Sequence, residues 1–184
     1  MKNREASSEN PWTILKLLKW ATDYFNDKEI DDPKAAAEIL LAQSLHLRRI
    51  DLYLQYDRPL EKRELSAFKI LLKRKLNREP VAYIVGHKEF WSKPFAVTND
   101  VLIPRPETEC LVEATMGIID ETGGGKNICV LELGTGSGAL IVSLASEKQG
   151  NDYYASDISE RALAIAKQNA VTHGLNDIHF FAGD

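Results

Sequence analysis

The sequence predicts an α/β chain in which a helical bundle precedes a parallel sheet of doubly wound type. Apolar residues recur at helical spacing through the first half of the 184 residues. In the second half, short apolar strands alternate with helices, which is typical of parallel strands joined by right-handed crossovers. The third strand ends with the chain, so we expect an incomplete sheet in a truncated domain. Three regions are expected: a helical domain at 1–86, a β-hairpin linker at 87–109 and the first part of the α/β domain at 110–184.

Proline and capping residues mark the helices of the first half. Asn10-Pro11 and Asp32-Pro33 each place a capping side chain before a proline at the first helical position. A long helix is expected from about Glu61 to Asn77, because leucine and phenylalanine recur there at helical spacing. Several helices joined by short polar turns predict a small bundle. Its core is expected to include Trp12, Trp20 and Phe25.

A β-hairpin is expected where the helical pattern ends. Aromatic and β-branched residues alternate with polar ones from Glu89 to Ile103, around a turn that we expect at Asn99-Asp100. Pro104 and Pro106 then fix a rigid, non-helical segment, because each proline restricts both its own backbone and that of the residue before it. The next helix is expected from Cys110 to Ile119.

The second half predicts three parallel strands, at 128–133, 153–156 and 178–182, with helices at 139–147 and 160–173. The run from Ile128 to Leu133 is almost continuously apolar, which is typical of a strand buried on both faces. In an incomplete sheet this first strand would form an open edge. Because an apolar edge favours pairing with another chain, self-association through the first strand is a further expectation.

Composition excludes several classes of protein. With 44% hydrophobic residues the chain is too apolar to be disordered, and no run approaches the roughly 18 apolar residues of a membrane span. Residues 1–10 are polar and mixed in charge, unlike a secretory signal. Cys110 and Cys129 have apolar neighbours and are expected to be small buried residues in the reducing cytoplasm. Neither C-x-x-C nor paired-histidine spacing occurs, so no metal site is expected.

Charge is unevenly divided along the chain. Residues 1–88 hold 17 Lys and Arg against 13 Asp and Glu, a net charge of +4, whereas residues 89–184 hold 6 against 14, a net charge of −8. This division indicates two units with different surfaces. Since phosphate affinity comes mainly from Lys and Arg, no stable nucleic-acid partner is expected for the acidic half. The basic run from Lys62 to Arg78 fits either a solvated helix face or a docking surface for an acidic macromolecule.

Three alternating glycines follow the first strand, in the segment Glu132-Leu133-Gly134-Thr135-Gly136-Ser137-Gly138. Glycine permits a tight turn and the close approach of a ligand, and the next helix offers unpaired N–H groups to ligand oxygens. The spacing also satisfies the loose dinucleotide pattern G-x-G-x-x-A. The third glycine and Glu132 favour S-adenosylmethionine, because a carboxylate attracts sulfonium and ammonium groups and repels the pyrophosphate of a dinucleotide.

Acidic residues end the next two strands. Asp157 ends the second strand and is expected beside the glycine loop, because the carboxyl ends of parallel strands meet at one edge of a sheet. Its carboxylate can accept two hydrogen bonds from the vicinal hydroxyls of a ribose. A capping role for the helix that begins near Ser159 is the alternative. Asp184 ends the third strand and is either an adenine contact or a frayed chain end.

Four sequence blocks resemble the HemK/PrmC family, the protein-(glutamine-N5) methyltransferases of peptide chain release factors. The blocks are Arg78-Glu79-Pro80-Val81-Ala82-Tyr83-Ile84-Val85-Gly86, Glu89-Phe90-Trp91, Leu102-Ile103-Pro104-Arg105-Pro106-Glu107-Thr108-Glu109, and the glycine loop with Asp157. The proline block is the most specific of them. The resemblance implies a helical substrate-recognition domain and a Rossmann-like, S-adenosylmethionine-dependent methyltransferase domain. It also implies methylation of the glutamine in the Gly-Gly-Gln motif of a release factor.

By the same resemblance, the donor is held by Gly134, Thr135, Gly136, Ser137 and Gly138, its ribose by Asp157, and Arg105 and Glu107 lie near the pocket. The catalytic Asn-Pro-Pro-Tyr signature of the family is absent from the chain. We therefore expect no catalytic residue within it, and an inactive fragment of an active enzyme. Two alternatives stay open: an amino-methyltransferase that acts on DNA or rRNA, and a non-catalytic cofactor-binding module.

Overall fold

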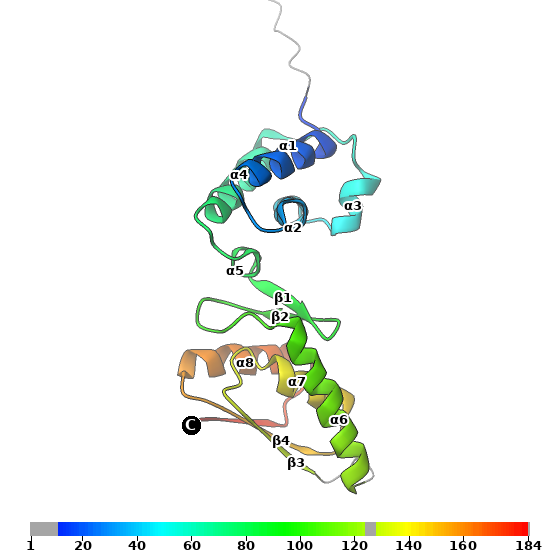
Figure 1. Cartoon of the computed structure of the whole chain (residues 1–184), viewed down its shortest axis with the longest axis vertical. Coiled ribbons are helices and arrows are strands. Elements are labelled where there is room, and N and C mark those ends of the chain that lie inside the picture. Colours follow the sequence, from blue (N-terminus) through cyan, green and yellow to red (C-terminus); the bar gives the residue numbers. More distant parts are fainter. Residues whose placement is uncertain (1–10, 124–127, 184) are drawn as a thin grey trace, which may run out of the picture. The chain divides into compact units, whose positions relative to one another are not determined.

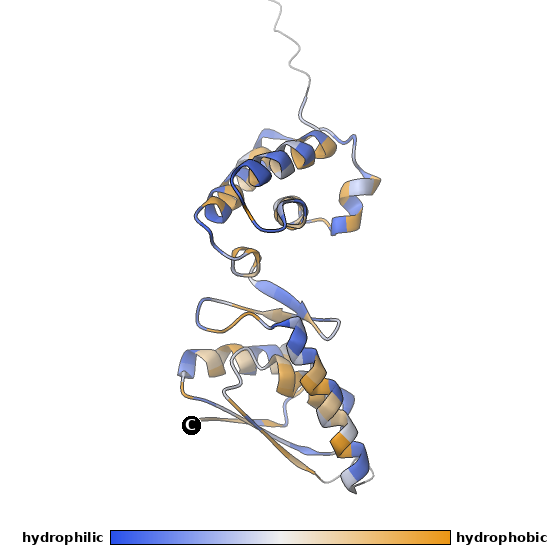
Figure 2. Ribbon diagram, in the orientation of Figure 1, coloured by the Kyte–Doolittle hydropathy of each residue, from blue (hydrophilic) through white to orange (hydrophobic). Residues whose placement is uncertain are grey.

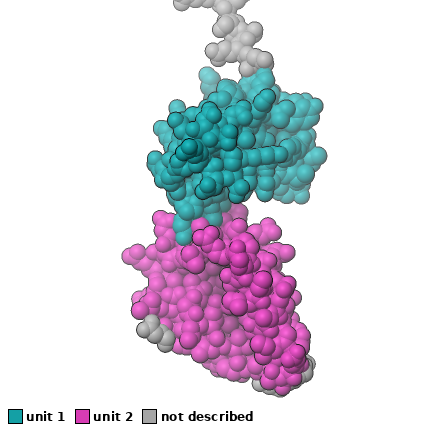
Figure 3. Space-filling view, in the orientation of Figure 1, with its two compact units in different colours: residues 1–85 teal, residues 86–184 magenta. Residues whose placement is uncertain are grey.

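The computed structural model describes residues 11–123 and 128–183. The chain divides into two compact units, unit 1 from Met1 to Val85 and unit 2 from Gly86 to Asp184 (Figure 3). Each unit has its own cluster of buried apolar side chains. The helical part of the sequence and the α/β part therefore form separate cores.

Unit 1 is built of α-helices (Figure 1). They are α1 (Ile14–Asp27), α2 (Pro33–Leu45), α3 (Arg49–Leu54), α4 (Lys62–Leu76) and α5 (Val81–Val85). Helix α2 begins at the predicted Asp32-Pro33 signal, but the Asp32 side chain makes no capping hydrogen bond. Helix α1 begins later than predicted: its N-cap is Thr13, whose Oγ1 accepts a hydrogen bond from the Lys16 N–H at 3.4 Å. Asn10 lies outside the described residues.

Apolar side chains from several helices fill the core of unit 1. Phe25, Leu40 and Leu41 are fully buried, and Figure 2 shows hydrophilic and hydrophobic residues alternating along α1 and α4, as amphipathic helices require. The prediction for Phe25 is confirmed. Trp12 and Trp20 are each 42% exposed, so their predicted place in the core is wrong. Trp12 precedes α1, and Trp20 lies off the buried stripe of that helix.

Unit 2 begins with an antiparallel hairpin of β1 (His87–Phe90) and β2 (Lys93–Ala96). Its turn lies at Trp91 and Ser92, which have φ angles of 50° and 55°. The predicted hairpin is therefore present, but Asn99-Asp100 is not its turn and forms a separate turn after β2. Positive φ at both turn positions usually requires Asn or Gly, so the turn residues themselves gave no signal.

Two helices hold this unusual turn in place. The Trp91 backbone N–H donates to Oε1 of Glu109 at 2.8 Å, and its indole N–H donates to Oε1 of Glu147 at 3.1 Å. Phe90 and Phe95, on either side of the turn, are buried in the core of unit 2. These contacts offset the backbone strain at the turn, which is of order 1–3 kcal/mol per residue.

A parallel sheet with helices on one side forms the rest of unit 2 (Figure 1). Its elements are η1 (Pro106–Thr108), α6 (Glu109–Gly123), β3 (Cys129–Leu133), α7 (Ala139–Glu147), β4 (Asp152–Asp157), α8 (Glu160–Thr172) and β5 (Ile178–Ala182). The strand order is β3-β4-β5 and both pairs are parallel, as predicted. Leu133 pairs with Ser156, and Asp157 pairs with Ala182, so the strands end together at one edge.

Strand β3 has one exposed face. Leu131 and Leu133 are 53% and 64% exposed, whereas Val130 and Glu132 between them are half-buried. The prediction of burial on both faces is wrong for the described residues, because the described helices cover only one side of the sheet (Figure 1). Cys129 and Cys110 are also exposed, which corrects the prediction that both are buried. Self-association through β3 stays a prediction.

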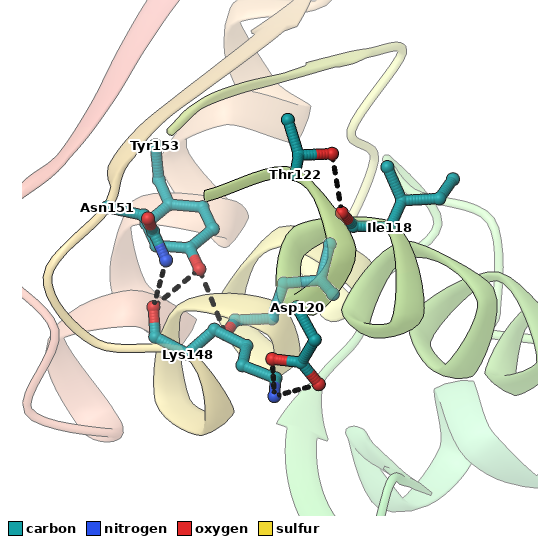
Figure 4. Close-up of polar contacts among 7 residues, drawn as sticks. Ile118, Asp120, Thr122, Lys148, Asn151 and Tyr153 are labelled. Carbon is teal, nitrogen blue, oxygen red and sulfur yellow. Dashed lines mark hydrogen bonds and ion pairs between the residues drawn. The ribbon is translucent and has the colours of Figure 1, made fainter. Parts of the chain in front are cut away.

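A polar network lies at the end of the sheet opposite the glycine loop (Figure 4). The Lys148 ammonium pairs with Asp120 of α6 at 2.6 Å. The Lys148 carbonyl accepts hydrogen bonds from the Asn151 amide at 3.0 Å and from the Tyr153 hydroxyl at 2.7 Å. Oδ1 of Asn151 accepts from the Ile128 N–H at 3.0 Å. One asparagine thus ties the start of β3 to the end of α7.

The two cores predict separate responses to core truncation. Phe25→Ala in unit 1 and Phe95→Ala in unit 2 should each cost about 3–5 kcal/mol of unfolding free energy, because each leaves a cavity in a packed core. Hydrogen exchange followed by mass spectrometry should show faster exchange only in the unit that carries the substitution. Equal acceleration in both units for either variant would contradict separate cores.

Candidate functional site

The segment from Gly134 to Gly138 joins β3 to α7 at the carboxyl edge of the sheet. Gly134 and Gly136 have positive φ angles of 70° and 55°. In the described part of the chain, and apart from the adjoining residues, no atom lies within 4 Å of a Cβ built on either glycine. Thr135 and Ser137, which alternate with the glycines, are buried. The turn is therefore fixed by the residues between the glycines, while the glycines border open space through which a ligand could approach the backbone.

The third glycine has a different role. A Cβ on Gly138 would lie 3.0 Å from the Ala166 Cβ of α8, and the residue has a φ angle of 77°. Its N–H donates to the Thr135 carbonyl at 2.8 Å, and its own carbonyl accepts from the Val142 N–H at 2.9 Å. Gly138 therefore permits the close packing of the loop on α8 and starts α7.

Asp157 contacts the loop directly from the end of β4. Its Oδ2 accepts a hydrogen bond from the Gly136 N–H at 2.8 Å, and its Oδ1 accepts one from the Ser159 N–H at 2.9 Å. The helix cap itself is Ser159, whose Oγ accepts from the Ala162 N–H at 3.2 Å. Asp157 thus lies beside the glycine loop and also supports the turn into α8. Each carboxylate oxygen keeps capacity for a further donor, such as a ribose hydroxyl.

Glu132 supports the glycine loop through hydrogen bonds. Its Oε2 accepts hydrogen bonds from the Thr135 hydroxyl at 2.7 Å and from the Ile141 N–H, in the first turn of α7, at 3.2 Å. Burial raises the pKa of Glu132 to about 7, and the nearby charge of Asp157 acts in the same direction. The carboxyl group therefore changes charge near neutral pH at the edge of the candidate site.

Asn169 on α8 contacts the loop and was not identified from the sequence. The side chain is 1% exposed, and its amide donates to the Ser137 carbonyl at 2.8 Å. The signal that could have found it is its position: a polar residue within the buried stripe that also holds Ala166 and Ala170. A buried amide almost always has hydrogen-bond partners, so its presence there predicts a backbone contact.

The other predicted site residues lie apart from this cluster. Arg105 and Glu107 are exposed on the segment that leads into α6. No hydrogen bond or ion pair joins them to loop 134–138 among the residues that the structure describes, so their place near a pocket stays a prediction. Asp184 lies outside the described residues.

The described residues include neither a metal-ligand cluster nor a membrane-spanning helix. Within residues 11–123 and 128–183, no group of three or more His, Cys, Asp and Glu side chains could hold a metal ion. Of the helices in these ranges, none combines the length and apolar character that a membrane crossing requires.

The geometry favours a ligand that combines positive charge with vicinal hydroxyls. Glu132 and Asp157 place two carboxyl groups beside an open, glycine-lined edge. A pyrophosphate would be repelled by such charges at short range, whereas a sulfonium or ammonium group would be attracted. The residues present therefore fit S-adenosylmethionine better than a dinucleotide.

Two glycine substitutions distinguish the glycine that packs against α8 from a glycine that borders open space. Gly136→Ala should cost about 1–2 kcal/mol of unfolding free energy, because only its left-handed backbone opposes a side chain. Gly138→Ala should cost more, by roughly a further 1–3 kcal/mol, because its methyl group would also overpack against Ala166. Urea unfolding of both variants measures the difference. Equal losses would show that the contact between loop and α8 is not tight.

The raised pKa of Glu132 predicts a specific pH dependence of stability. The folded protein keeps a proton on this carboxyl at pH values where the unfolded chain, with a pKa near 4.5, has lost it. This group therefore makes stability fall as the pH rises from about 4.5 to 7, by about 2–3 kcal/mol in total. Glu132→Gln stays neutral, so urea unfolding at pH 5 and pH 8 should show a smaller decline. An identical decline in both proteins would contradict the assignment.

Two family models match consecutive parts of the chain. Residues 16–86 match the PrmC N-terminal domain, and residues 125–184 match a methyltransferase domain. The release factor glutamine methyltransferase of Chlorobaculum tepidum is 39% identical over 179 residues, which cover 96% of this chain and 61% of that protein. The release factor glutamine methyltransferase of Rhodopirellula baltica is 42% identical over 174 residues, which cover 94% of this chain and 59% of that protein.

A third relative, the bifunctional methyltransferase of Rickettsia typhi, is 35% identical over 181 residues, which cover 90% of this chain and 35% of that protein. The chain spans about three-fifths of the length of the first two relatives. The two matched domains occur in the order that the sequence blocks predict, the helical one first. The chain is therefore similar over nearly its whole length to release factor glutamine methyltransferases, and it matches a PrmC N-terminal domain followed by a methyltransferase domain.

Proposed function

We propose that the chain supplies the S-adenosylmethionine site of an enzyme that methylates the glutamine of a Gly-Gly-Gln motif in peptide chain release factors. The observation that carries this proposal is the hydrogen bond from the Gly136 N–H to Asp157, beside the open edge at Gly134 and Gly136. The relatives named release factor glutamine methyltransferase support the substrate.

The residues of the candidate site have separate tasks in this proposal. Gly134 and Gly136 let the donor approach the backbone closely. Asp157 accepts hydrogen bonds from the ribose hydroxyls. Glu132, when ionised, attracts the cationic part of the donor. S-adenosylmethionine supplies an activated methyl group when bound. The chain's residues bind and orient the donor.

The amide nitrogen of the substrate glutamine determines what else methyl transfer requires. An amide nitrogen is a poor nucleophile, because its lone pair is delocalised into the carbonyl group. Transfer to it depends on alignment with the methyl group and on exclusion of water. We propose that residues 1–86 recognise the release factor, that the segment 87–109 joins the two parts, and that Arg105 and Glu107 lie where the glutamine enters.

A protein substrate suits the basic helix α4 better than a nucleic acid does. Arg74 pairs with Glu79 and donates to the Ile84 carbonyl at 3.2 Å. Arg78 donates to the Glu29 and Lys28 carbonyls at 2.6 Å and 3.0 Å. These bonds tie both guanidinium groups to unit 1 itself, which leaves fewer of their N–H donors for phosphate contacts.

Substitution of Asp157 tests the cofactor site. Asp157→Ala should raise the Kd for S-adenosylmethionine by about tenfold to hundredfold, because charge-assisted hydrogen bonds to the ribose are lost. Asp152→Ala is the matched control, since Asp152 is an exposed carboxylate at the opposite end of the same strand. Isothermal titration calorimetry measures both variants. An unchanged Kd for Asp157→Ala, or binding of NAD in place of S-adenosylmethionine, would contradict the proposal.

The substrate class has its own test. Titration of the full chain with a release factor that carries Gly-Gly-Gln should give a measurable binding heat, and titration with duplex DNA or rRNA should not. The contact is expected to be with protein, because the relatives are named for a protein substrate and residues 89–184 carry a net charge of −8. Preferential binding of DNA or rRNA would favour the amino-methyltransferase alternative. Binding of the cofactor with neither macromolecule would favour the non-catalytic module.

A further inference from the structure

The side chain of Asn169 is bonded to two separate parts of unit 2. Its Oδ1 accepts from the Ala96 N–H at 2.8 Å, and its Nδ2 donates to the Ala96 carbonyl at 3.0 Å. The same Nδ2 donates to the Ser137 carbonyl at 2.8 Å. One amide thus pairs with the last residue of the hairpin as a neighbouring strand would, and also holds the glycine loop.

The bond to Ser137 fixes a peptide plane of the loop. The carbonyl of this peptide belongs to Ser137 and accepts from Asn169, while its N–H belongs to Gly138 and donates to the Thr135 carbonyl at 2.8 Å. Since the peptide group is planar, bonds on both sides prevent its rotation. The conformation of the turn beside Gly136 therefore depends on Asn169.

One face of α8 carries all the contacts of this arrangement. Ala166 lies under Gly138, and Asn169 lies one turn later on the same face. His173, the C-cap of α8, follows on that face, with Nε2 2.9 Å from the Pro94 carbonyl oxygen and its ring 4.9 Å from that of Phe95. The middle of α8 thus contacts the glycine loop, and the C-terminal end of α8 contacts the hairpin.

We propose that Asn169 is a positioning residue that couples the hairpin to the loop that receives S-adenosylmethionine. This inference rests on the proposed function and adds to it. Through Asn169, the place of β2 on α8 sets the orientation of the Ser137 peptide. Since coupling between sites is reciprocal, donor binding at the loop also steadies the hairpin.

The test compares Asn169→Ala with a matched control, Asn151→Ala. Like Asn169, Asn151 accepts from a backbone N–H, that of Ile128, and donates to a backbone carbonyl, that of Lys148, but it lies at the opposite end of the sheet. Asn169 donates to a second backbone carbonyl, that of Ser137, in addition to that of Ala96. Both variants should unfold at lower temperature. Well below that temperature, amide exchange by NMR should be about tenfold faster at Gly138 in Asn169→Ala and unchanged in Asn151→Ala, because one hydrogen bond of about 1.4 kcal/mol is lost at the loop.

Donor affinity is the second measurement. Asn169→Ala should raise the Kd for S-adenosylmethionine about tenfold, and Asn151→Ala should leave it unchanged. In the wild-type chain the donor should also slow exchange of the Val97 N–H, which bonds to the Gly86 carbonyl beside the hairpin; Asn169→Ala should abolish this effect. If Asn169→Ala unfolds the chain, Asn169→Ser keeps a smaller polar group in place and should change both quantities in the same direction.

The outcomes separate this inference from the proposed function. Equal effects of Asn169→Ala and Asn151→Ala on Gly138 exchange and on Kd would overturn the positioning role, while wild-type binding of the donor would leave the proposed function intact. Failure of the wild-type chain to bind S-adenosylmethionine would overturn the proposed function and the cofactor role of Asn169 with it.

Discussion

The parallel pairing of β3 with β4 is the constraint on which the candidate site depends. Because Leu133 pairs with Ser156, the residues that follow them meet at one edge of the sheet. The Thr135 N–H extends this pairing by donating to the Ser156 carbonyl at 2.9 Å. Asp157 then reaches the Gly136 N–H. Residues 21 positions apart in the chain thus form one site through backbone geometry, with few side chains needed to shape it.

Stability and ligand binding make opposing demands at this edge. A buried carboxyl group such as Glu132 costs stability when it is ionised, and its raised pKa reflects that cost. The same charge would attract a cationic donor. The positive φ angles at positions 134 and 136 favour glycine, and because glycine has no side chain, the space that a donor would fill stays open. Departures from the most stable arrangement are expected where a fold carries function.

Features with a strong local pattern could be predicted from the sequence. The alternation of apolar strands and helices predicts the parallel sheet, and the order of the motifs predicts that Asp157 lies beside the glycine loop. The hairpin turn could not be placed, because the hydrogen bonds that hold it join Trp91 to Glu109 and Glu147, which are distant in sequence. The exposure of Cys129 depends on which face of β3 the helices cover. The partners of Asn169 are backbone atoms of Ala96 and Ser137, so the residue types at these two positions do not indicate the contact.

The central claim is that the edge formed by Gly134, Gly136 and Asp157 holds S-adenosylmethionine. Backbone NMR of the full chain during titration with this nucleoside tests it most directly. The account predicts that the largest amide shifts fall on these residues and their immediate neighbours, with unit 1 unchanged. Saturable shifts concentrated elsewhere, with the loop amides unmoved, would contradict it.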